Sequence, residues 1–182
     1  MAEKSKLKII DWPSGLKLIM ASSLKFLPKL QFNPEKFNNM RLEEIQTQAF
    51  IGSFDFSNGP IEVLCLPNSL TKISSQAFAN MNQDSVIKGN YMINEVQFGG
   101  VGMPWTLDLN SYNLVSNIFS QNKLAQAPND LNATVDTPIR KYTLYKDSTA
   151  SEPTIDTFKL FLENKCIGDD NLLTGGYEVI DA

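Results

Sequence analysis

Apolar residues recur at a fixed spacing in the stretch from Leu66 to Met81. Four of them follow one another at intervals of three, four and one residues: Leu70, Ile73, Ala77 and Phe78. This spacing places their side chains on one face of a helical or irregular turn. A shorter copy stands upstream, from Leu42 to Phe50, with Leu, Ile and Gln-Ala-Phe in the same phase. A period in the twenties predicts units that bury their faces by stacking on one another.

Other stretches follow the same template less completely. Residues 9–24 fit it without gaps, with Trp12-Pro13 in place of Leu66-Pro67 and with apolar positions at Leu16, Ile19 and Leu24. Residues 111–122 give a weaker match, in which Leu114, Ile118 and Phe119 fall on Ile73, Ala77 and Phe78. An irregular unit, as expected of a terminal repeat, contains an echo of Phe78 to Met81 at Phe37 to Met40.

Alternating apolar and polar positions predict β-strands elsewhere in the chain. Residues 61–66 form a strand that Pro67 ends, because proline has no N–H to donate to a sheet. Phe54 and Phe56 predict a shorter strand before it, joined to it through a turn at 58–60. A further alternation surrounds Ile93, Val96 and Phe98. Near the C-terminus, strands are expected at 139–146, 157–163 and 177–180.

We therefore expect a β-rich α+β fold, organised as a short irregular solenoid with a β-rich C-terminal segment. Residues 1–122 would form the repeat-like domain, with an insertion at 82–106. From about Lys123 the chain becomes rich in Ala, Pro, Asn, Asp, Ser and Thr, which is typical of loops. Residues 123–182 would then form a β-rich cap or an arm that reaches a neighbouring subunit.

Residues 66–81 resemble the BspA-type leucine-rich repeats. The units of that family read roughly as Leu-Pro, a Ser, an apolar residue, Thr, then Ile and Ala-Phe, which matches LPNSLTKISSQAF here. The match is good over 66–81, fair over 37–50 and loose over 9–24, and Met81 stands where Cys is common. The resemblance implies a short parallel-strand solenoid used for adhesion or protein binding, with no catalytic residues to carry over.

Composition narrows the range of functions. The chain has 182 residues, enough for one domain with a sizeable core. It contains no His, which excludes Ser-His-Asp and Cys-His catalysis and a His-ligated zinc site within the chain. Only Arg41 and Arg140 supply guanidinium groups, and the net charge is −4, so nucleic acid is not an expected partner. Cys65 and Cys166 lack CxxC spacing, and we expect two separate buried thiols.

The N-terminal stretch is basic and then apolar, as in a secretory leader. Asp11, Pro13, Lys17 and Lys25 interrupt its apolar run, so we interpret it as part of the mature protein. No window holds the ~20 apolar residues that a membrane-spanning helix needs, and no membrane insertion is expected. The expected location is therefore the cytoplasm or an assembled particle.

Three kinds of motif are candidates for chemical sites. Gly99-Gly100-Val101-Gly102 resembles part of a phosphate-binding loop but lacks the Gly-Lys-Ser/Thr ending, which favours a turn. Asp169-Asp170 and Glu43-Glu44 lack the alternating ligand spacing of a calcium loop, which favours solvated surface charge. Trp105, Tyr112 and Phe119 are irregularly spaced aromatic residues, which favours the core. We therefore assign no catalytic, cofactor or metal residues, and expect no cofactor.

Three functions remain open. The first is a non-catalytic protein–protein interaction module, whose partner is another protein or a copy of itself. The second is a structural subunit of a larger assembly, such as a phage or virus particle, with termini that pair with neighbouring subunits. The third is a carboxylate-dependent enzyme such as a glycosidase, which would need two carboxyl groups across one cleft.

Overall fold

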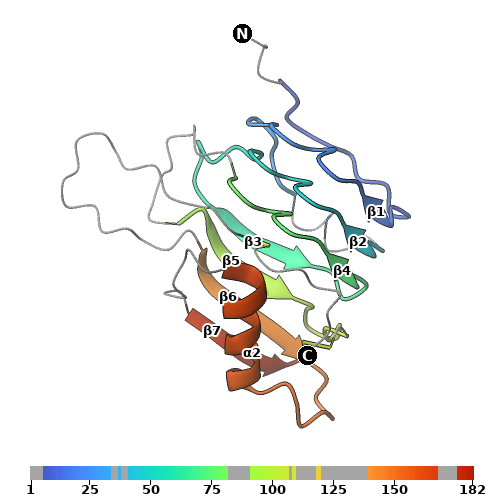
Figure 1. Ribbon diagram of the computed structural model, residues 1–182, viewed down its shortest axis with the longest axis vertical. Helices are drawn as coiled ribbons and strands as arrows, with labels where there is room; N and C mark the ends of the chain where they lie inside the picture. Colours follow the sequence, from blue (N-terminus) through green and yellow to red (C-terminus); the bar gives the residue numbers. More distant parts are fainter. Residues whose placement is uncertain are drawn as a thin grey trace, which may run out of the picture.

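The computed structural model describes residues 6–33, 37, 41–81, 91–106, 108–109, 118–119, 139–167 and 176–182. Over these residues the chain is β-rich α+β, with two parallel sheets and one α-helix (Figure 1). This confirms the predicted class. The N-terminal segment and the last strand lie at opposite ends of the long axis of the molecule (Figure 1).

The smaller sheet joins three two-residue strands in the order β1-β2-β4, all parallel. They are β1 (Leu18–Ile19), β2 (Glu44–Ile45) and β4 (Lys72–Ile73). Ile19 pairs with Ile45, and Ile45 pairs with Ile73, so paired residues in successive strands are separated by nearly equal lengths of chain. All three Ile side chains are buried. The sequence alignment of residues 9–24 with the clearer copies is thus confirmed at Ile19.

Three units, residues 16–27, 42–53 and 70–81, share this register and also share their backbone turns. Each unit contains two residues in the left-handed region of backbone conformation, which residues other than glycine rarely adopt. The first position has φ values of 55°, 56° and 58° at Ser22, Gln48 and Gln76. The second has φ values of 56°, 68° and 42° at Phe26, Gly52 and Asn80. Both positions recur with the same spacing as the paired Ile residues, so the three units turn in the same way.

A ladder of backbone hydrogen bonds links these units to the C-terminal half of the chain. In each step the N–H of one residue donates to a carbonyl of the next segment: Leu24 to Ala49, Phe50 to Ala77, Phe78 to Ile118 and Phe119 to Cys166. The rings of Phe50, Phe78 and Phe119 stack along the ladder, with centroids 4.9 and 5.4 Å apart. The weak sequence match that sets Ile118 and Phe119 on Ala77 and Phe78 is confirmed at these two residues, whereas Leu114 lies outside the described residues.

The larger sheet is also parallel, in the order β3-β5-β6-β7. Its strands are β3 (Ile61–Leu66), β5 (Ile93–Phe98), β6 (Ile139–Lys146) and β7 (Gly176–Asp181). The predicted strands at 61–66 and 139–146 have these bounds, and the one at 177–180 is longer by one residue at each end. Leu66, Phe98 and Leu144 lie in register and are fully buried, so this face of the sheet forms part of the core.

The predicted strand at 157–163 is wrong, because these residues are helical. Helix α2 (Ile155–Phe161) continues into the π-helical turn η1 (Leu162–Ile167). Thr154 caps the helix by accepting a hydrogen bond from the N–H of Thr157 at 3.3 Å. Phe158, Phe161 and Leu162 are buried at helical spacing, whereas Leu160, expected to share a strand face with Phe158, is 56% exposed.

The predicted strand at Phe54 and Phe56 is also wrong. Phe54 has a φ of 79°, which an extended strand does not allow, although both rings are buried. The turn after them is present, and β3 follows it. β5 lies within the stretch expected as an insertion, residues 82–106, and the larger sheet draws strands from both sides of residue 122. The division into two domains at that point stays a prediction.

Candidate interaction surface

Three large apolar side chains face outward from the first unit. Leu18, Met20 and Phe26 are 39%, 62% and 59% exposed, and we call them the apolar end surface. The other two units carry polar residues or glycine at the same offsets: Glu44 and Lys72, Gln46 and Ser74, Gly52 and Asn80. The first unit therefore exposes apolar side chains where its neighbours carry polar residues or glycine.

The first unit also lies at the edge of the smaller sheet. β1 pairs with β2 on one side, where the carbonyls of Lys17 and Ile19 accept hydrogen bonds from β2 and the residues flanking it. Alternate residues of a parallel strand use opposite sides. The N–H groups of Leu18 and Met20 therefore face the open side of β1. This places apolar side chains and outward-facing backbone donors on one strand edge.

Phe26 combines an unfavourable backbone with an exposed ring. A left-handed conformation costs about 1–2 kcal/mol for a residue with a Cβ, and burial of the ring offsets little of this. The ring lies against the second unit, since a Cβ at Gly52 would lie 2.6 Å from Cδ1 of Phe26. Lys25 Nζ stands 5.9 Å from the ring centroid. The same left-handed turn recurs at Gly52 and Asn80, so what distinguishes Phe26 is the large exposed ring that it carries at this position.

Ion pairs flank the apolar end surface and connect the units. Lys17 Nζ lies 2.6 Å from Glu43 Oε1, and Lys72 Nζ lies 2.9 Å from Glu44 Oε1. The hydrogen bond from Lys72 lowers the pKa of the Glu44 carboxyl below its ordinary value, against the smaller effect of desolvation. Charged residues thus bridge neighbouring strands, whereas Leu18 in the first strand carries no charge at the matching position.

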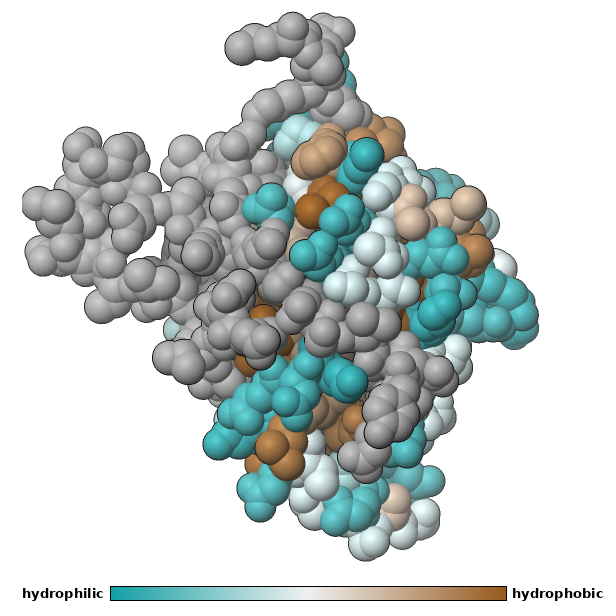
Figure 2. Space-filling view, in the orientation of Figure 1, coloured by the Kyte–Doolittle hydropathy of each residue, from teal (hydrophilic) through white to brown (hydrophobic). Residues whose placement is uncertain are grey.

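Exposed apolar residues are concentrated in the N-terminal segment. Of the nine large apolar side chains exposed in the described part of the chain, five lie between residues 7 and 26: Leu7, Ile9, Leu18, Met20 and Phe26. Figure 2 shows brown and tan side chains at the upper right of the molecule, over the position of β1 in Figure 1, with teal side chains around them. Single exposed apolar residues are ordinary, whereas several within one segment make that segment a candidate contact surface.

A second candidate is a pocket of about 340 Å³ beside the end of β6. It lies between residues 105–109 and 146–157 and is lined by apolar side chains, Lys146 and three carboxylates: Asp108, Asp147 and Glu152. Trp105 lines it too, and its buried indole N–H has no hydrogen-bond partner among the described residues. Carboxylates beside apolar walls could serve acid–base chemistry if one of them held its proton near neutral pH.

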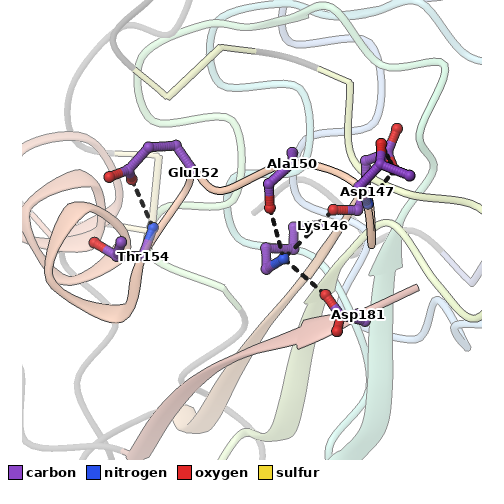
Figure 3. Close-up of polar contacts among 7 residues, drawn as sticks. Lys146, Asp147, Ala150, Glu152, Thr154 and Asp181 are labelled. Carbon is purple, nitrogen blue, oxygen red and sulfur yellow. Dashed lines mark hydrogen bonds and ion pairs between the residues drawn. The ribbon is translucent and has the colours of Figure 1, made fainter.

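The charged groups of this pocket already have internal partners (Figure 3). Lys146 Nζ lies 2.7 Å from Asp181 and donates to the carbonyl of Ala150 at 2.9 Å. Asp147 accepts hydrogen bonds from the N–H and hydroxyl of Thr149 at 2.9 and 2.8 Å, and these lower the pKa of its carboxyl. A lowered pKa is opposite to what a general acid needs. The geometry indicates that these residues shape the loop after β6.

The sequence motifs that suggested chemistry have structural roles where they are described. Residues 99–103 form a tight hairpin, in which Gly100 and Met103 exchange two backbone hydrogen bonds of 2.9 Å. The predicted turn is confirmed. Gly99, at a φ of 77°, is required there because a Cβ would lie 2.8 Å from two backbone atoms of the following residues. Glu43 and Glu44 pair with lysines of neighbouring units, and Asp169-Asp170 lies outside the described residues.

The aromatic and cysteine residues are part of the core. Trp105 and Phe119 are buried, as expected, and Tyr112 lies outside the described residues. Cys65 and Cys166 are buried and do not form a disulfide, which confirms the expectation of two separate thiols. Desolvation raises the pKa of Cys65 to about 12 and raises that of Cys166 still further. Both groups are therefore protonated and unreactive in the folded protein.

The sequence interpretation missed the apolar end surface, although a signal for it was present. Aligning residues 9–24 with 42–50 and 70–78 sets Leu18 on Glu44 and Lys72, and Met20 on Gln46 and Ser74. An apolar residue at a position that is charged in other units indicates a surface with a different neighbour.

In the described part of the chain, no three His, Cys, Asp or Glu side chains gather as a metal-binding group. None of the helices described there is long and apolar enough to cross a membrane. No family model, curated protein or solved structure matches the chain.

Proposed function

We propose that the chain is a non-catalytic protein–protein interaction module, built as a short solenoid of leucine-rich-repeat type, and that its apolar end surface is the binding site. The observation that carries the proposal is the exposure of Leu18, Met20 and Phe26 at positions where the next two units are polar or glycine.

The solenoid interpretation is supported by the register of the three units. Their strands align at nearly equal intervals along the chain, and their left-handed residues recur at the same intervals. The resemblance of residues 66–81 to BspA-type repeats agrees with this period. In that family the repeats serve adhesion or protein binding, which is the source of the functional class proposed here.

The chemistry of the end unit supports a binding role. Terminal units of a solenoid have only one neighbour and need a polar outer face to remain soluble. The first unit instead exposes apolar side chains on an open strand edge, where a partner could add backbone hydrogen bonds. Polar residues or glycine at these three positions are compatible with the fold, since the second and third units carry them there. The apolar residues therefore serve contact with another molecule.

The alternative, a structural subunit of a larger assembly, has its own support. β1 and β7 are edge strands at opposite ends of the molecule (Figure 1). Open strand edges are templates for pairing with another chain. Such a subunit would use the same apolar end surface, so the two functions differ in the partner.

Affinity purification with matched variants tests the binding site. The double variant Leu18→Ser, Met20→Ser removes two residues of the apolar end surface. Its control, Val101→Ser, Met103→Ser, removes residues of 81% and 39% exposure from the hairpin at 99–103. We expect the control to retain the proteins that the wild-type chain captures and the double variant to lose them. Capture of the same proteins by the double variant would refute the assignment of the site.

A further inference from the structure

We propose that the apolar end surface binds an extended peptide segment of another protein, which joins the smaller sheet as a parallel strand beside β1. The inference rests on the proposed function, because it names the kind of partner that the same surface accepts. Three observations support it: the hydrogen bonds between neighbouring units, the open backbone groups of the first unit, and the side chains beside those groups.

Neighbouring units are joined by backbone hydrogen bonds in a fixed order. On the side that meets the first unit, the second unit uses the N–H groups of Glu43, Glu44 and Gln46 and then the carbonyls of Thr47, Ala49 and Ile51. The third unit meets the second through the N–H groups of Thr71, Lys72 and Ser74 and then the carbonyls of Ser75, Ala77 and Asn80. Each unit thus offers the preceding one three donors followed by three acceptors.

The first unit carries the same groups, but no described unit precedes it. In the register that pairs Leu18 with Glu44, they are the N–H groups of Lys17, Leu18 and Met20 and the carbonyls of Ala21, Ser23 and Lys25. None of these groups has a hydrogen-bond partner within the part of the chain that the structure describes. β1 is an edge strand of the smaller sheet (Figure 1). A parallel peptide backbone has carbonyls and N–H groups at the spacing needed to pair with them.

The side chains at this edge indicate the composition of the partner segment. Leu18 and Met20 stand beside the open N–H groups and would pack against apolar side chains of an added strand. Residues 16–27 contain two Lys and no acidic residue. Lys17 is paired with Glu43, whereas Lys25 is exposed and forms no ion pair with any described residue. We therefore expect a segment that combines apolar residues with an acidic residue opposite Lys25. The first unit of a second copy would not supply that acidic residue.

A displayed library of random twelve-residue peptides tests the proposal. We expect the wild-type chain to enrich apolar peptides that contain an acidic residue. The variant Leu18→Ser, Met20→Ser should not bind the enriched peptides, whereas the control Val101→Ser, Met103→Ser should bind them as the wild-type chain does. Lys25→Glu should lose the preference for the acidic residue.

Methylation of the peptide backbone separates strand pairing from side-chain contact. An enriched peptide is synthesised in two forms, each with N-methyl groups on alternate residues and the two forms one residue out of phase. Alternate residues of a parallel strand direct their N–H groups to opposite sides. Only the form whose methyl groups face β1 should therefore lose binding, although both forms keep every side chain.

Hydrogen exchange of the chain gives a second measurement. The amides of Leu18 and Met20 would donate to the added strand. With the unmethylated peptide at about ten times its Kd, their exchange should slow about tenfold, because only the free molecules exchange. The amide of Val101, in the hairpin at 99–103, should exchange at the same rate with and without the peptide.

Three results would overturn the proposal and leave the proposed function intact. Equal binding of both methylated forms, with unchanged exchange at Leu18 and Met20, would reduce the contact to side chains. Failure to enrich any peptide, while Leu18→Ser, Met20→Ser still loses captured proteins, would assign the surface to a folded partner. Flotation with phosphatidylserine vesicles or concentration-dependent sedimentation, in place of peptide binding and lost in the same variant, would assign it to a lipid surface or to a second copy. Unchanged capture of proteins by this variant would instead refute the proposed function itself.

Discussion

Phe78 is the residue whose truncation should most directly test the packing of the repeated units. Its side chain is fully buried, and its ring stacks on Phe50 at 4.9 Å and on Phe119 at 5.4 Å. Its N–H donates to the carbonyl of Ile118 at 2.9 Å, which Phe78→Ala would leave in place. The substitution therefore removes side-chain packing and leaves the backbone ladder unchanged.

We expect Phe78→Ala to lower the free energy of unfolding by about 3–5 kcal/mol, the usual cost of emptying a buried Phe site. In a chain of this size that corresponds to a fall in Tm of roughly 6–20 °C. Phe78→Leu fills most of the volume but removes two stacked ring pairs, at about 0.5–1.5 kcal/mol each, so it should cost about 1–3 kcal/mol. Comparison of the two variants therefore separates the stability lost with side-chain volume from the stability lost with ring stacking.

The measurement is urea denaturation followed by circular dichroism, with Asn68→Ala as the control. Asn68 is half-buried, and its carbonyl, which accepts a hydrogen bond from Thr106, remains in the variant. The control should change stability by no more than about 0.5 kcal/mol. If Phe78→Ala and Asn68→Ala had equal, small effects, the stacked arrangement of the units would be wrong.

Three further predictions concern other parts of the chain. Gly99→Ala should lower stability by more than about 1–2 kcal/mol, the cost of left-handed strain alone, because its Cβ would also clash with backbone atoms; thermal unfolding measures this. Cys65 and Cys166 should be inert to a thiol reagent at pH 8 in the native protein, and both should react in urea; a fast-reacting native thiol would contradict their burial. The pKa of Glu44 is lowered on folding from its ordinary value of 4.5, chiefly by the hydrogen bond from Lys72. This pairing therefore stabilises the protein at pH values above 4.5, and the stabilisation is lost as the pH falls through the pKa of the folded state. Glu44→Gln should therefore cost about 0.2–1 kcal/mol at neutral pH and nothing well below the folded pKa, as urea midpoints at the two pH values would show.

The sequence predicted correctly those strands in which polar and apolar residues alternate and a turn or proline marks an end. The strands at 61–66 and 139–146 alternate polar and apolar residues beside turns or proline, and their bounds are those observed. The stretch at 157–163 alternates as well, but Thr154 caps a helix that buries Phe158 and Phe161. A short alternation of apolar and polar residues does not distinguish a strand from a helix, and here the burial of Phe158 and Phe161 in the core favours the helix.

The candidate surface shows a different limit of sequence reasoning. Buried positions such as Ile19 and Ile45 could be aligned because apolar residues recur there. Outward positions such as Leu18 carry their signal in the differences between units, since Glu44 and Lys72 stand at the matching positions, and a pattern of recurring apolar residues does not contain that signal. Phe26 aligns with Gly52 and Asn80, two residue types that favour the left-handed region, but its own left-handed backbone is visible only in the structure.

The hydrogen-bonded ladder has a consequence for protein engineering. Its successive donors, Leu24, Phe50, Phe78 and Phe119, are separated by unequal lengths of chain, the longest of them between Phe78 and Phe119, yet each bonds to the next segment in the same way. The fold therefore fixes the ladder and leaves the length of chain between its steps free to change. Lengthening a loop carries only a small entropic cost, about 0.6 kcal/mol for each doubling. The exposed hairpin tip at Val101 is thus a suitable place to graft a foreign peptide, with both ends of the molecule kept intact.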